Sequence, residues 1–467
     1  MSDPATVPTV LVANRGEIAV RVIEAAHRIG ARAVLAVSTA DRDSVGAHLA
    51  DETIVIGPAQ ASQSYLRPEF IAQAALQSGA DVVHPGYGFL SEQPELTEIL
   101  EAEGVAFAGP RAETLRAVGD KSSARKVAIA AGVPVAAAAP VVDPHDAEHL
   151  RGLGESVGYP LLVKAVYGGG GRGIRLAPDY ETLVQLAPQA AAEAIAAFGN
   201  GELYVERYYG AARHVEVQVF GDGDGGVLIF GDRDCSVQRR HQKLIEECPA
   251  PGLSEQRRRV LHDASRALVR ELRYRGAGTI EFMVDTQSED VIFLEVNARI
   301  QVEHPVTEEA FGVDLVAAQL RLALGLDPQL PEVPAVPPAT AIEVRVNAED
   351  PDRDFRPAPG RITTVSWPRG PGIRVDTHLR DEYSFPPFYD SLMAKLIVRA
   401  HDRAAAVGAL ESAVRRTRID GVVTTLPLHE HVLNHPDFRA GGVPTTWFGP
   451  LWEEHSRATA EMRKADR

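Results

Sequence analysis

The chain has 467 residues, of which 45% are apolar and 24% are charged, and its formal net charge is −16. This balance is typical of a soluble globular protein, and the length predicts two to four domains. The negative charge argues against a surface for nucleic acid or for an anionic membrane, so any bound anion must meet locally concentrated cations.

Only two cysteines occur, Cys235 and Cys248, which predicts no disulfide framework and favours a cytoplasmic protein. Cys235 stands among charged residues, where it could be a nucleophile, but an ordinary thiol is the better interpretation. Residues 1–8 lack the basic and apolar regions of a secretory signal. The most apolar run, 127–142, is interrupted by a glycine and two prolines and is too short to cross a bilayer, so no membrane association is expected.

The first 120 residues alternate strand and helix. Residues 9–13 form an apolar run, a helix follows, and residues 32–37 form a second strand. The helix has an apolar stripe at helical spacing: Ile18, Val22, Ala25, Ala26 and Ile29. This rhythm predicts a parallel sheet covered by helices. A further strand, 80–83, leads into the loop 84–92, and such loops at carboxyl ends of strands often bind ligands.

The pattern changes to antiparallel from about residue 120 to residue 330, with paired short strands, glycine turns and interrupting helices. The proline-rich stretch 328–338 predicts a stiff linker and the clearest boundary in the chain. The region from 340 to about 450 is again rich in strands and closes with the amphipathic stretch 403–416. The expected fold class is therefore α/β and α+β, in several domains.

Two acidic residues are predicted to face each other across a hairpin. Residues 279–284 and 291–296 alternate as strands do, and a turn centred on Ser288 places Glu281 opposite Glu295. Opposed carboxylates repel, and a divalent cation such as Mg²⁺, which prefers oxygen ligands, would remove that repulsion. The alternative is a solvated hairpin face with alternating charge.

Polar residues continue beyond this hairpin at every second position. Because side chains alternate along a strand, five of them would share one face: Glu295, Asn297, Arg299, Gln301 and Glu303. The opposite face would be apolar: Val296, Ala298, Ile300 and Val302. Two acids, a guanidinium and two amides exceed what a solvent face needs, so segment 295–304 is predicted to be the centre of an active site.

A glycine-rich segment lies between two other predicted strands. Lys164 ends the first strand, glycines occupy most of 168–173, and Ile174 begins the second strand. A strand after the glycines excludes a dinucleotide-binding turn, which a helix would follow, and no Gly-Lys pair of a P-loop occurs. The segment instead predicts a flap whose backbone N–H groups close over phosphates. A similar pattern of glycines at 221–226 is interpreted as a plain hairpin turn.

Basic residues gather at two further places. The run 233–243 is densely cationic and either forms a solvated loop or, with its interleaved glutamines and His241, an anion pocket. His214 begins a strand, and Arg345 lies inside the alternating strand 341–347. That arginine either serves a site or pairs with Glu343, two residues away on the same face.

Across these motifs the sequence resembles the biotin carboxylase component of biotin-dependent carboxylases, a branch of the ATP-grasp superfamily. The resemblance runs from Ala13 to Gly421 and is carried by long stretches: 13–17, 84–92, 168–173, 233–243, 295–309 and 347–351. It implies three regions: an N-terminal α/β domain (1–119) with a Rossmann-like parallel sheet, an ATP-grasp domain (120–330) with a mobile lid at about 136–207, and a strand-rich C-terminal domain (339–450).

The resemblance also implies a nucleotide site. Lys121 and Lys164 would contact ATP phosphates, with the flap closing over them through Gly168, Gly169, Gly170 and Gly171. Glu206, Arg207 and Tyr209 would hold the adenine edge, and His214 would lie near the ribose. His241 and Lys243 would line the phosphate and bicarbonate region.

The remaining implied roles concern metal, bicarbonate and biotin. Glu281, Glu295 and Asn297 would coordinate magnesium, or manganese in its place. Bicarbonate would lie against Arg299, Gln301 and Val302, and Glu303 would be the general base that deprotonates it. Arg345, near Tyr87, would stabilise the enolate-like ureido group of biotin. The implied activity is ATP-dependent carboxylation of carrier-linked biotin through carboxyphosphate, the first half-reaction of an acyl-CoA carboxylase.

Expected partners follow from the same resemblance. The chain ends at Arg467 without a lipoyl-like domain or an Ala-Met-Lys-Met sequence, so biotin is expected on a biotin carboxyl carrier protein or on a part of a longer polypeptide. A carboxyltransferase subunit would take the carboxyl group. The first helix carries an i, i+4, i+7, i+11 stripe, expected to be exposed and salt-bridged: Glu17, Arg21, Glu24 and Arg28. The alternative is a solvated face, but in the family this helix contributes to a homodimer interface, so a homodimer is expected.

Two other functions remain open at this stage. One is an ATP-grasp ligase acting on another carboxylate, as in carbamoyl-phosphate or peptide-type ligases; the 299–303 pattern with Arg345 argues against it. The other is a nucleotide-sensing module without catalysis, which would have no need of Glu303 and Lys243 beside the metal carboxylates.

Overall fold

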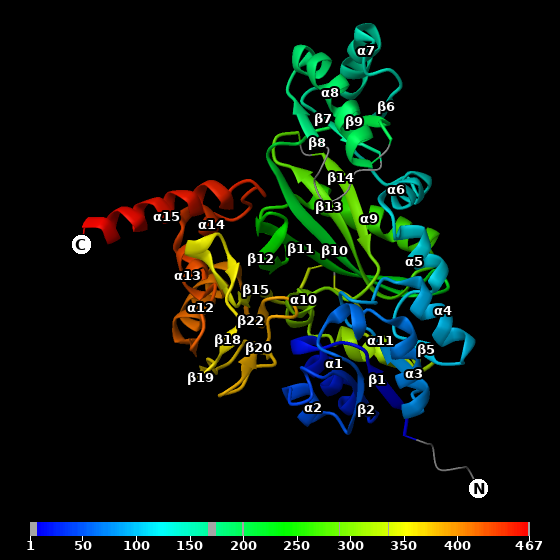
Figure 1. Cartoon of the computed structure of the whole chain (residues 1–467), viewed down its shortest axis with the longest axis vertical. Helices are drawn as coiled ribbons and strands as arrows, with labels where there is room; N and C mark the ends of the chain where they lie inside the picture. Colours follow the sequence, from blue (N-terminus) through cyan, green and yellow to red (C-terminus); the bar gives the residue numbers. More distant parts are fainter. Residues whose placement is uncertain (1–6, 167–173, 199, 289, 335, 466–467) are drawn as a thin grey trace.

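The computed structural model describes residues 7–166, 174–198, 200–288, 290–334 and 336–465. It mixes α/β and α+β layers, as predicted. Figure 1 shows a blue N-terminal part, a lid projecting at the top, a long central sheet in green, and C-terminal helices in orange and red at the left. No helix in the described ranges is long and apolar enough to cross a membrane.

The N-terminal part is the predicted parallel sheet with helices. Its strands run in the order β3-β2-β1-β4-β5, all parallel: β1 (Thr9–Val12), β2 (Arg32–Ser38), β3 (Glu52–Gly57), β4 (Val82–His84) and β5 (Ala106–Phe107). The helices are α1 (Gly16–Arg28), α2 (Val45–Leu49), α3 (Pro68–Ser78), α4 (Pro94–Ala102) and α5 (Ala112–Val118). The predicted stripe of α1 is buried from Ile18 to Ala26, which confirms the helical period.

The polar stripe of α1 is not the exposed face that its spacing suggested. Glu17 and Arg21 are only 2% and 5% exposed, whereas Glu24 and Arg28 are exposed. Arg21 pairs with Glu308 (2.8 Å) and Asp314 (2.6 Å), residues almost 300 positions away, rather than along its own helix. The prediction of an exposed intrahelical stripe is therefore wrong for its first half, because α11 and β20 pack against α1.

The loop after β4 is held by a side chain from the first βα turn. Asn14 donates through Nδ2 to the carbonyl oxygens of Pro85 (2.7 Å) and Tyr87 (2.8 Å). Gly86 has φ +63°, and a Cβ there would lie 2.8 Å from Asn14 Nδ2, so only glycine fits without displacement. This bond between two distant motifs fixes where Tyr87 stands.

The lid has its own sheet and core. Strands β6 (Ala138–Val141), β9 (Leu203–Arg207), β7 (Leu161–Ala165) and β8 (Ile174–Ala177) pair antiparallel in that order. Helices α7 (Ala147–Val157) and α8 (Tyr180–Phe198) cover it, and α6 (Lys121–Ala130) precedes it. The strands on either side of the glycine-rich segment are thus confirmed, while Gly168, Gly169, Gly170 and Gly171 lie outside the described residues.

One eight-stranded sheet contains strands from both sides of the proline-rich linker 328–338. Its order is β14-β13-β10-β11-β12-β15-β22-β20. The strands before the linker are β10 (Ala212–Asp222), β11 (Val227–Arg239), β12 (Gln242–Cys248), β13 (Arg275–Asp285) and β14 (Val291–Asn297); those after it are β15 (Thr340–Asn347), β20 (Ile373–Thr377) and β22 (Leu392–Ala400). The turn at 223–226 is the predicted hairpin between β10 and β11. Because β12 pairs with β15, segments on both sides of the linker build one sheet.

Helices line this sheet. Helices α9 (Glu255–Glu271), α10 (His304–Phe311) and α11 (Leu315–Ala323) come before the linker. Helix α10 packs on β15 and β22, and α11 packs between α1 and β13. The predicted amphipathic stretch is α12 (Arg403–Arg416), but it does not close the region, since three more helices follow: α13 (Leu426–Asn434), α14 (Pro436–Ala440) and α15 (Phe448–Ala465). Small strand pairs complete the C-terminal part: β16 (Glu349–Asp350) with β17 (Arg356–Pro357), β18 (Gly360–Arg361) with β21 (Ser384–Phe385), and β19 (Thr364–Ser366) with β23 (Arg418–Asp420).

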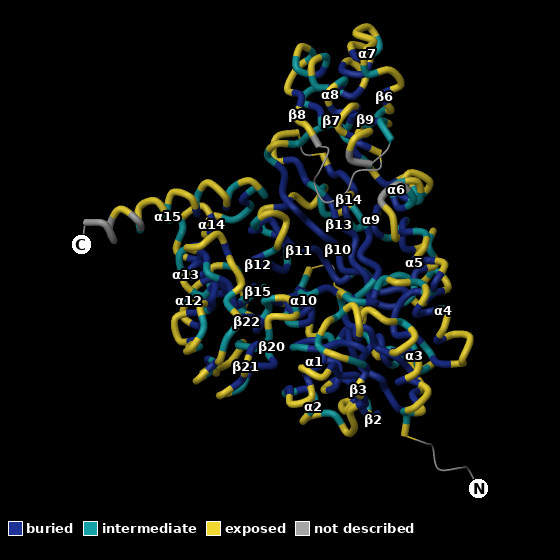
Figure 2. The backbone as a smooth tube through the Cα atoms, in the orientation of Figure 1, coloured by how far each residue is buried: buried dark blue, intermediate teal, exposed yellow. Residues whose placement is uncertain are grey.

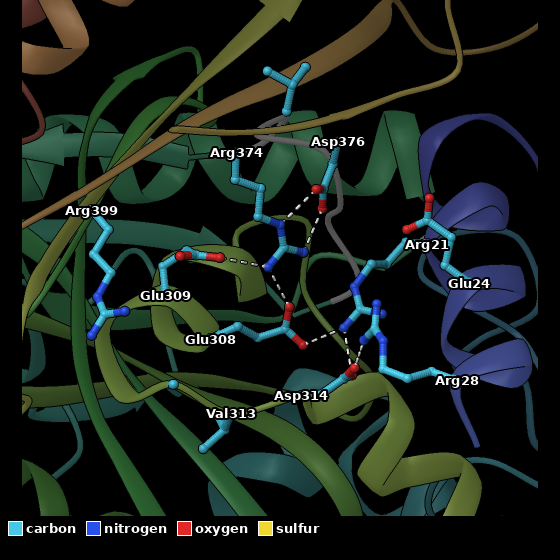
Figure 3. Close-up of a pocket in the computed structure, with 12 residues that line it drawn as sticks. Arg21, Glu24, Arg28, Glu308, Glu309, Val313, Asp314, Arg374, Asp376 and Arg399 are labelled. Carbon is cyan, nitrogen blue, oxygen red and sulfur yellow. Dashed lines mark hydrogen bonds and ion pairs between the residues drawn. The ribbon is translucent and has the colours of Figure 1, made fainter. Parts of the chain in front are cut away.

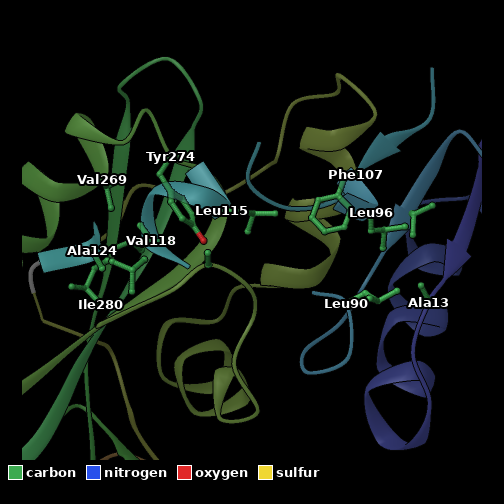
Figure 4. Close-up of a cluster of buried hydrophobic side chains, with 14 of the residues drawn as sticks. Ala13, Leu90, Leu96, Phe107, Leu115, Val118, Ala124, Val269, Tyr274 and Ile280 are labelled. Atoms are coloured by element: carbon green, nitrogen blue, oxygen red, sulfur yellow. The ribbon is translucent and has the colours of Figure 1, made fainter. Parts of the chain in front are cut away.

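Buried residues concentrate where the N-terminal part meets the central sheet (Figure 2). One apolar cluster joins the two (Figure 4): Leu90, Leu96, Phe107 and Val118 from the N-terminal part, Ala124 from α6, and Ile280 from the central sheet. Burying such side chains stabilises the packing by roughly 1.5–3 kcal/mol each. The lid relies on a separate cluster that includes Leu161, Val163 and Leu183, which leaves it attached to the body mainly through its ends.

Candidate active site

The hairpin of β13 and β14 places two acids as predicted. Glu281 pairs in register with Glu295, and a bulge follows, after which Phe282 pairs with Phe293. Beyond Asn297 the prediction of a continuing strand is wrong. The strand ends there, residues 298–303 are irregular, and α10 begins at His304. Pro305, in the first turn of α10, has no N–H to give to a sheet, which favours a helix start at this point.

The polar residues of 297–303 nevertheless converge. Arg299 donates to Asn297 Oδ1 (2.9 Å) and to Gln301 Oε1 (2.8 Å). Gln301 in turn donates through Nε2 to Glu281 Oε1 (3.1 Å). Side-chain hydrogen bonds, rather than strand alternation, therefore bring these groups to one side of the hairpin.

Lys243, on β12, is the centre of this site. Its Nζ lies 2.7 Å from Glu216 Oε2, 2.9 Å from Glu281 Oε1 and 2.7 Å from Glu303 Oε1. Burial alone would lower its pKa, but Glu216 and Glu303 raise the pKa of Lys243 well above its usual value. The lysine is therefore a fixed cation among three buried carboxylates, so this end of the basic run 233–243 points into the protein rather than to solvent.

Glu303 is held between two cations. Besides Lys243, the Nη2 of Arg345 lies 2.8 Å from Glu303 Oε2. Burial would raise the pKa of Glu303, but Lys243 and Arg345 hold it well below its usual value. Its carboxylate is therefore ionised at neutral pH and able to accept a proton once these cations donate elsewhere.

Arg345 does not pair with Glu343, so that alternative is wrong. It donates through Nε to Glu246 Oε1 (2.6 Å) and through Nη2 to Glu303. The two oxygens of Glu343 are buried without a hydrogen-bond partner among the described residues. Burial and the facing Glu246 raise the pKa of Glu343 well above its usual value, so a neutral acid stands behind the arginine.

Glu246→Gln is expected to remove a pH dependence of stability. Burial raises the pKa of Glu246 to about 7, so the folded chain binds this proton more tightly than the unfolded chain does. Its contribution to stability is present below the unfolded pKa of about 4.3 and is lost as pH rises through 7. We compare the free energy of unfolding of the unaltered chain with that of E246Q. The difference between the two should fall by roughly 1–3 kcal/mol between about pH 5 and about pH 8.

Urea unfolding at both pH values measures this difference, with Glu113→Gln, at an exposed position on α5, as the matched control. A difference between the unaltered chain and E246Q that stays constant with pH would contradict the raised pKa.

Three of the implied ATP-binding residues that the structure describes lie on the lid, namely Lys164, Glu206 and Arg207. Lys164 on β7 pairs with Glu206 on β9 (2.6 Å). Arg207 and Tyr209 follow on the same segment and are partly buried. The backbone of Lys121 begins α6, but its side chain lies outside what the structure describes. His214 lies away from the lid, 3.0 Å from Glu281 Oε2.

His241 is not brought into the buried cluster. It is exposed in the tight turn between β11 and β12, where Arg240 and His241 both have positive φ, +48° and +68°. The basic run is therefore split: Arg233 and Lys243 point inward, while Arg240 and His241 face solvent.

Tyr87 is bound to the first helix of the N-terminal part. Its hydroxyl donates to Glu17 on α1. Burial and Glu17 raise the pKa of Tyr87 well above its usual value, so the phenol remains a donor.

The sequence interpretation missed three acids. Glu216 is fully buried and contacts both Lys243 and Arg233; its place two residues after His214 on an alternating strand was an available signal. Glu92 accepts from Arg299 Nε (3.0 Å) and from the Ala298 amide (3.1 Å), and it ends the loop 84–92 that was singled out. Glu246 carried no local signal, because its partner Arg345 is 99 residues away.

The donor set fits magnesium. Glu281 and Glu295 are opposed carboxylates with Asn297 beside them, and hard oxygen donors are what Mg²⁺ prefers. His214, Glu216 and Glu281 also offer atoms within 4.8 Å of one another, as do Glu216, Cys235 and Glu303. Burial raises the pKa of Cys235 well above its usual value, which keeps it a protonated, unreactive thiol.

Comparison with known proteins covers nearly the whole chain. Three family models match: "Biotin carboxylase, N-terminal domain" over residues 6–115, "Carbamoyl-phosphate synthase L chain, ATP binding domain" over 120–332, and "Biotin carboxylase C-terminal domain" over 343–449. A biotin carboxylase of Nostoc sp. is 44% identical over 438 residues, which is 94% of this chain and 98% of that protein.

Solved structures agree with the sequence relatives. A biotin carboxylase complex with β,γ-ATP from Campylobacter jejuni superposes with a TM-score of 0.85 at 40% identity, covering 95% of this chain and 99% of that one. The biotin carboxylase domain dimer of Hydrogenobacter thermophilus 2-oxoglutarate carboxylase, in complex with MgADP and bicarbonate, gives 0.83 at 40% identity, covering 96% and 97%. This chain therefore belongs to the biotin carboxylase family of ATP-grasp enzymes, and it carboxylates biotin with bicarbonate using ATP and magnesium.

Proposed function

We propose that the site divides along segment 281–303. Glu281, Glu295 and Asn297 hold magnesium, which neutralises charge on the ATP phosphates when bound. Bicarbonate lies against Arg299, Gln301 and the backbone of Val302, with Glu303 as its base. The observation that carries this division is Lys243, whose Nζ lies within 3 Å of both Glu281 and Glu303 and so joins the metal half to the bicarbonate half.

The nucleotide half rests on the lid. Lys121 and Lys164 meet the phosphates, with Gly168 to Gly173 closing on them, and Glu206, Arg207 and Tyr209 meet the adenine. The Lys164–Glu206 pair supports this, because it places a cation and an acceptor side by side on adjacent lid strands. His214 is proposed near the ribose. His241, in the turn between β11 and β12, is proposed to line the phosphate and bicarbonate region.

The chemical steps follow from these positions. Glu303 takes the proton of bicarbonate, whose oxygen then attacks the γ-phosphate to give carboxyphosphate and ADP. Lys243 offsets the negative charge of that transfer. As Lys243 and Arg345 turn from Glu303 to the substrates, the pKa of Glu303 rises and it becomes a stronger base. Carboxyphosphate then breaks at its carbon–oxygen bond into carbon dioxide and phosphate, and this phosphate accepts the ureido N–H proton of biotin. Arg345 and Tyr87 stabilise the negative charge on the ureido oxygen, which makes the nitrogen nucleophilic towards the carbon dioxide.

We further propose the division into domains 1–119, 120–330 and 339–450, with a lid at about 136–207. The ranges of the three family matches support it. The second and third domains would then share the sheet at β12 and β15 rather than meet through the linker alone.

The proposed partners are a biotin carboxyl carrier protein and a carboxyltransferase subunit, with an acyl-CoA as the acceptor. A homodimer is also proposed, through the face of α1 where Glu24 and Arg28 line a cavity of about 450 Å³ (Figure 3). Its support is the dimer of the H. thermophilus relative. A cytoplasmic location is proposed from the two unpaired cysteines.

One measurement tests the reaction: bicarbonate-dependent ATP hydrolysis with and without free biotin, in the presence of magnesium. We expect hydrolysis to require bicarbonate. We expect it to increase when biotin is added, because biotin consumes the carbon dioxide that the reaction forms. A ligase for another carboxylate would show no biotin stimulation, and a nucleotide sensor would show no turnover. Absence of stimulation in an intact preparation would overturn the assignment.

A further inference from the structure

Lys395 is a fully buried lysine to which the proposed reaction gives no role. It lies on β22 with 0% exposure, opposite Arg345 on β15 and Asp376 on β20. Taking an ammonium group out of water is costly unless its partners compensate for the lost hydration. An apolar side chain of the same length would fill the space without this penalty, so the charge itself calls for an explanation.

The ammonium group joins segments that are far apart in the chain. Its Nζ donates to the carbonyl oxygen of Val302 (3.1 Å), the residue immediately before Glu303. It also forms an ion pair with Glu17 on α1 (2.9 Å) and lies 3.6 Å from Asp376 Oδ2. Burial would lower the pKa of Lys395, but Glu17 and Asp376 raise it, so the ammonium form persists.

Each partner leads to a different half of the active site. Glu17 accepts the hydroxyl of Tyr87, and Lys395 Nζ lies 6.0 Å from the centre of the Tyr87 ring. The Val302 carbonyl belongs to the peptide plane that leads into Glu303, so holding it restricts the orientation of the base. One ammonium group therefore contacts both the biotin side and the bicarbonate side.

Asp376 anchors this arrangement. It accepts two hydrogen bonds from Arg374, at 2.7 and 2.8 Å, and Arg374 also donates to Glu308 of α10 (2.8 Å) (Figure 3). Glu308 stands one and a half turns along α10 from Glu303. The lysine is thus held on one side by groups that also hold the helix following the base.

We propose that Lys395 is a positioning residue that sets the bicarbonate-binding segment at Val302 and Glu303 in register with the biotin-binding Tyr87. This rests on the roles proposed above for those residues. It acts through Val302 and Glu17 and touches no reacting atom. Loss of the ammonium group would leave the two half-sites intact but misaligned.

Lys395→Met, which keeps the side-chain length, is the direct test. We expect kcat/KM for bicarbonate and for free biotin to fall about 10- to 100-fold, since misplacements of about 1 Å have effects of this size. The Kd for ATP, measured by calorimetry, should stay within about twofold, because the partners of Lys395 described above, Val302, Glu17 and Asp376, lie outside the lid. Lys126→Met, at an exposed position on α6, is the matched control and should leave all three values unchanged. Equal losses in ATP affinity and in kcat/KM would overturn the proposal.

A double substitution separates positioning from folding. Lys395→Met leaves Glu17 as an uncompensated buried carboxylate, which lowers the melting temperature. Adding Glu17→Gln removes that charge, so Glu17→Gln/Lys395→Met should recover stability but not kcat/KM for bicarbonate, since Val302 still lacks its donor. Recovery of stability and catalysis together would show a purely structural role and overturn the proposal.

The link to Tyr87 is tested by a double-mutant cycle. If Lys395 acts through Glu17 on Tyr87, the effects of Tyr87→Phe and Lys395→Met on the KM for biotin should be clearly less than multiplicative. Multiplicative effects would overturn this half of the proposal. The unaltered chain is assayed first: failure to turn over with bicarbonate and biotin would contradict the proposed function, whereas an active unaltered chain with an equally active Lys395→Met contradicts the positioning role alone.

Discussion

Glu303→Gln is expected to abolish turnover while ATP affinity stays near that of the unaltered chain. The amide cannot take the proton of bicarbonate, and loss of a general base typically lowers the rate about 10²- to 10⁴-fold. Glutamine has nearly the same shape, but its single carbonyl oxygen can accept from only one of the two donors, because Lys243 and Arg345 contact different oxygens of Glu303. Bicarbonate-dependent ATP hydrolysis measures the loss, and calorimetric titration with ATP measures the affinity.

The matched control is Glu113→Gln, the same exchange at an exposed position outside the site, which should leave both quantities unchanged. A large loss of ATP binding in E303Q would mean that Glu303 serves the nucleotide and that the base is misassigned.

Among the substitutions proposed here, Lys243→Met should lower the free energy of unfolding the most. It should also inactivate the enzyme. It removes the common cation of Glu216, Glu281 and Glu303, and breaking a buried ion pair by removing one partner costs about 3–5 kcal/mol. Lys243 lowers the pKa of Glu281 and of Glu303, so both pKa values rise in the folded variant that lacks the lysine, and this variant binds protons more tightly. Its stability should therefore increase as pH falls, which reverses the contribution that Glu303 makes in the unaltered chain.

Urea unfolding at about pH 7 and about pH 5.5, with Lys126→Met as the control, measures both effects. A Lys243→Met variant as stable as the unaltered chain at about pH 7 would contradict the central role given to this ammonium group.

Much of the fold could be predicted because it depends on local periodicity. The apolar stripe of α1 and the pairing of Glu281 with Glu295 follow from periods of 3.6 and 2 that each segment carries by itself. The end of β14 could not be found this way. Residues 295–303 keep a period of two in sequence, yet the chain leaves the strand at Asn297 because α10 packs on β15 and β22 and draws its first turn away from the hairpin.

In the candidate site, local sequence patterns likewise could not predict which charged residues pair. The predicted residues Glu281, Gln301 and Glu303 do lie together, because Gln301 bonds to Glu281 and Lys243 pairs with both acids. The partners of Arg345, by contrast, are 42 and 99 residues away, and those of Arg21 almost 300. No local pattern could choose Glu246 over Glu343 for Arg345, since Glu343 is nearer in sequence and on the same face.

The sequence by itself therefore determined the family, the strands and helices with a clear local period, such as α1 and the β13–β14 hairpin, and the chemical groups of segment 281–303. Only the tertiary structure decided which cation meets which carboxylate, that Glu17 and Arg21 are buried, and that β12 and β15 join two regions in one sheet. The physical reason is that side-chain period is a local property, whereas burial and ion pairing depend on which distant surfaces come together when the chain folds.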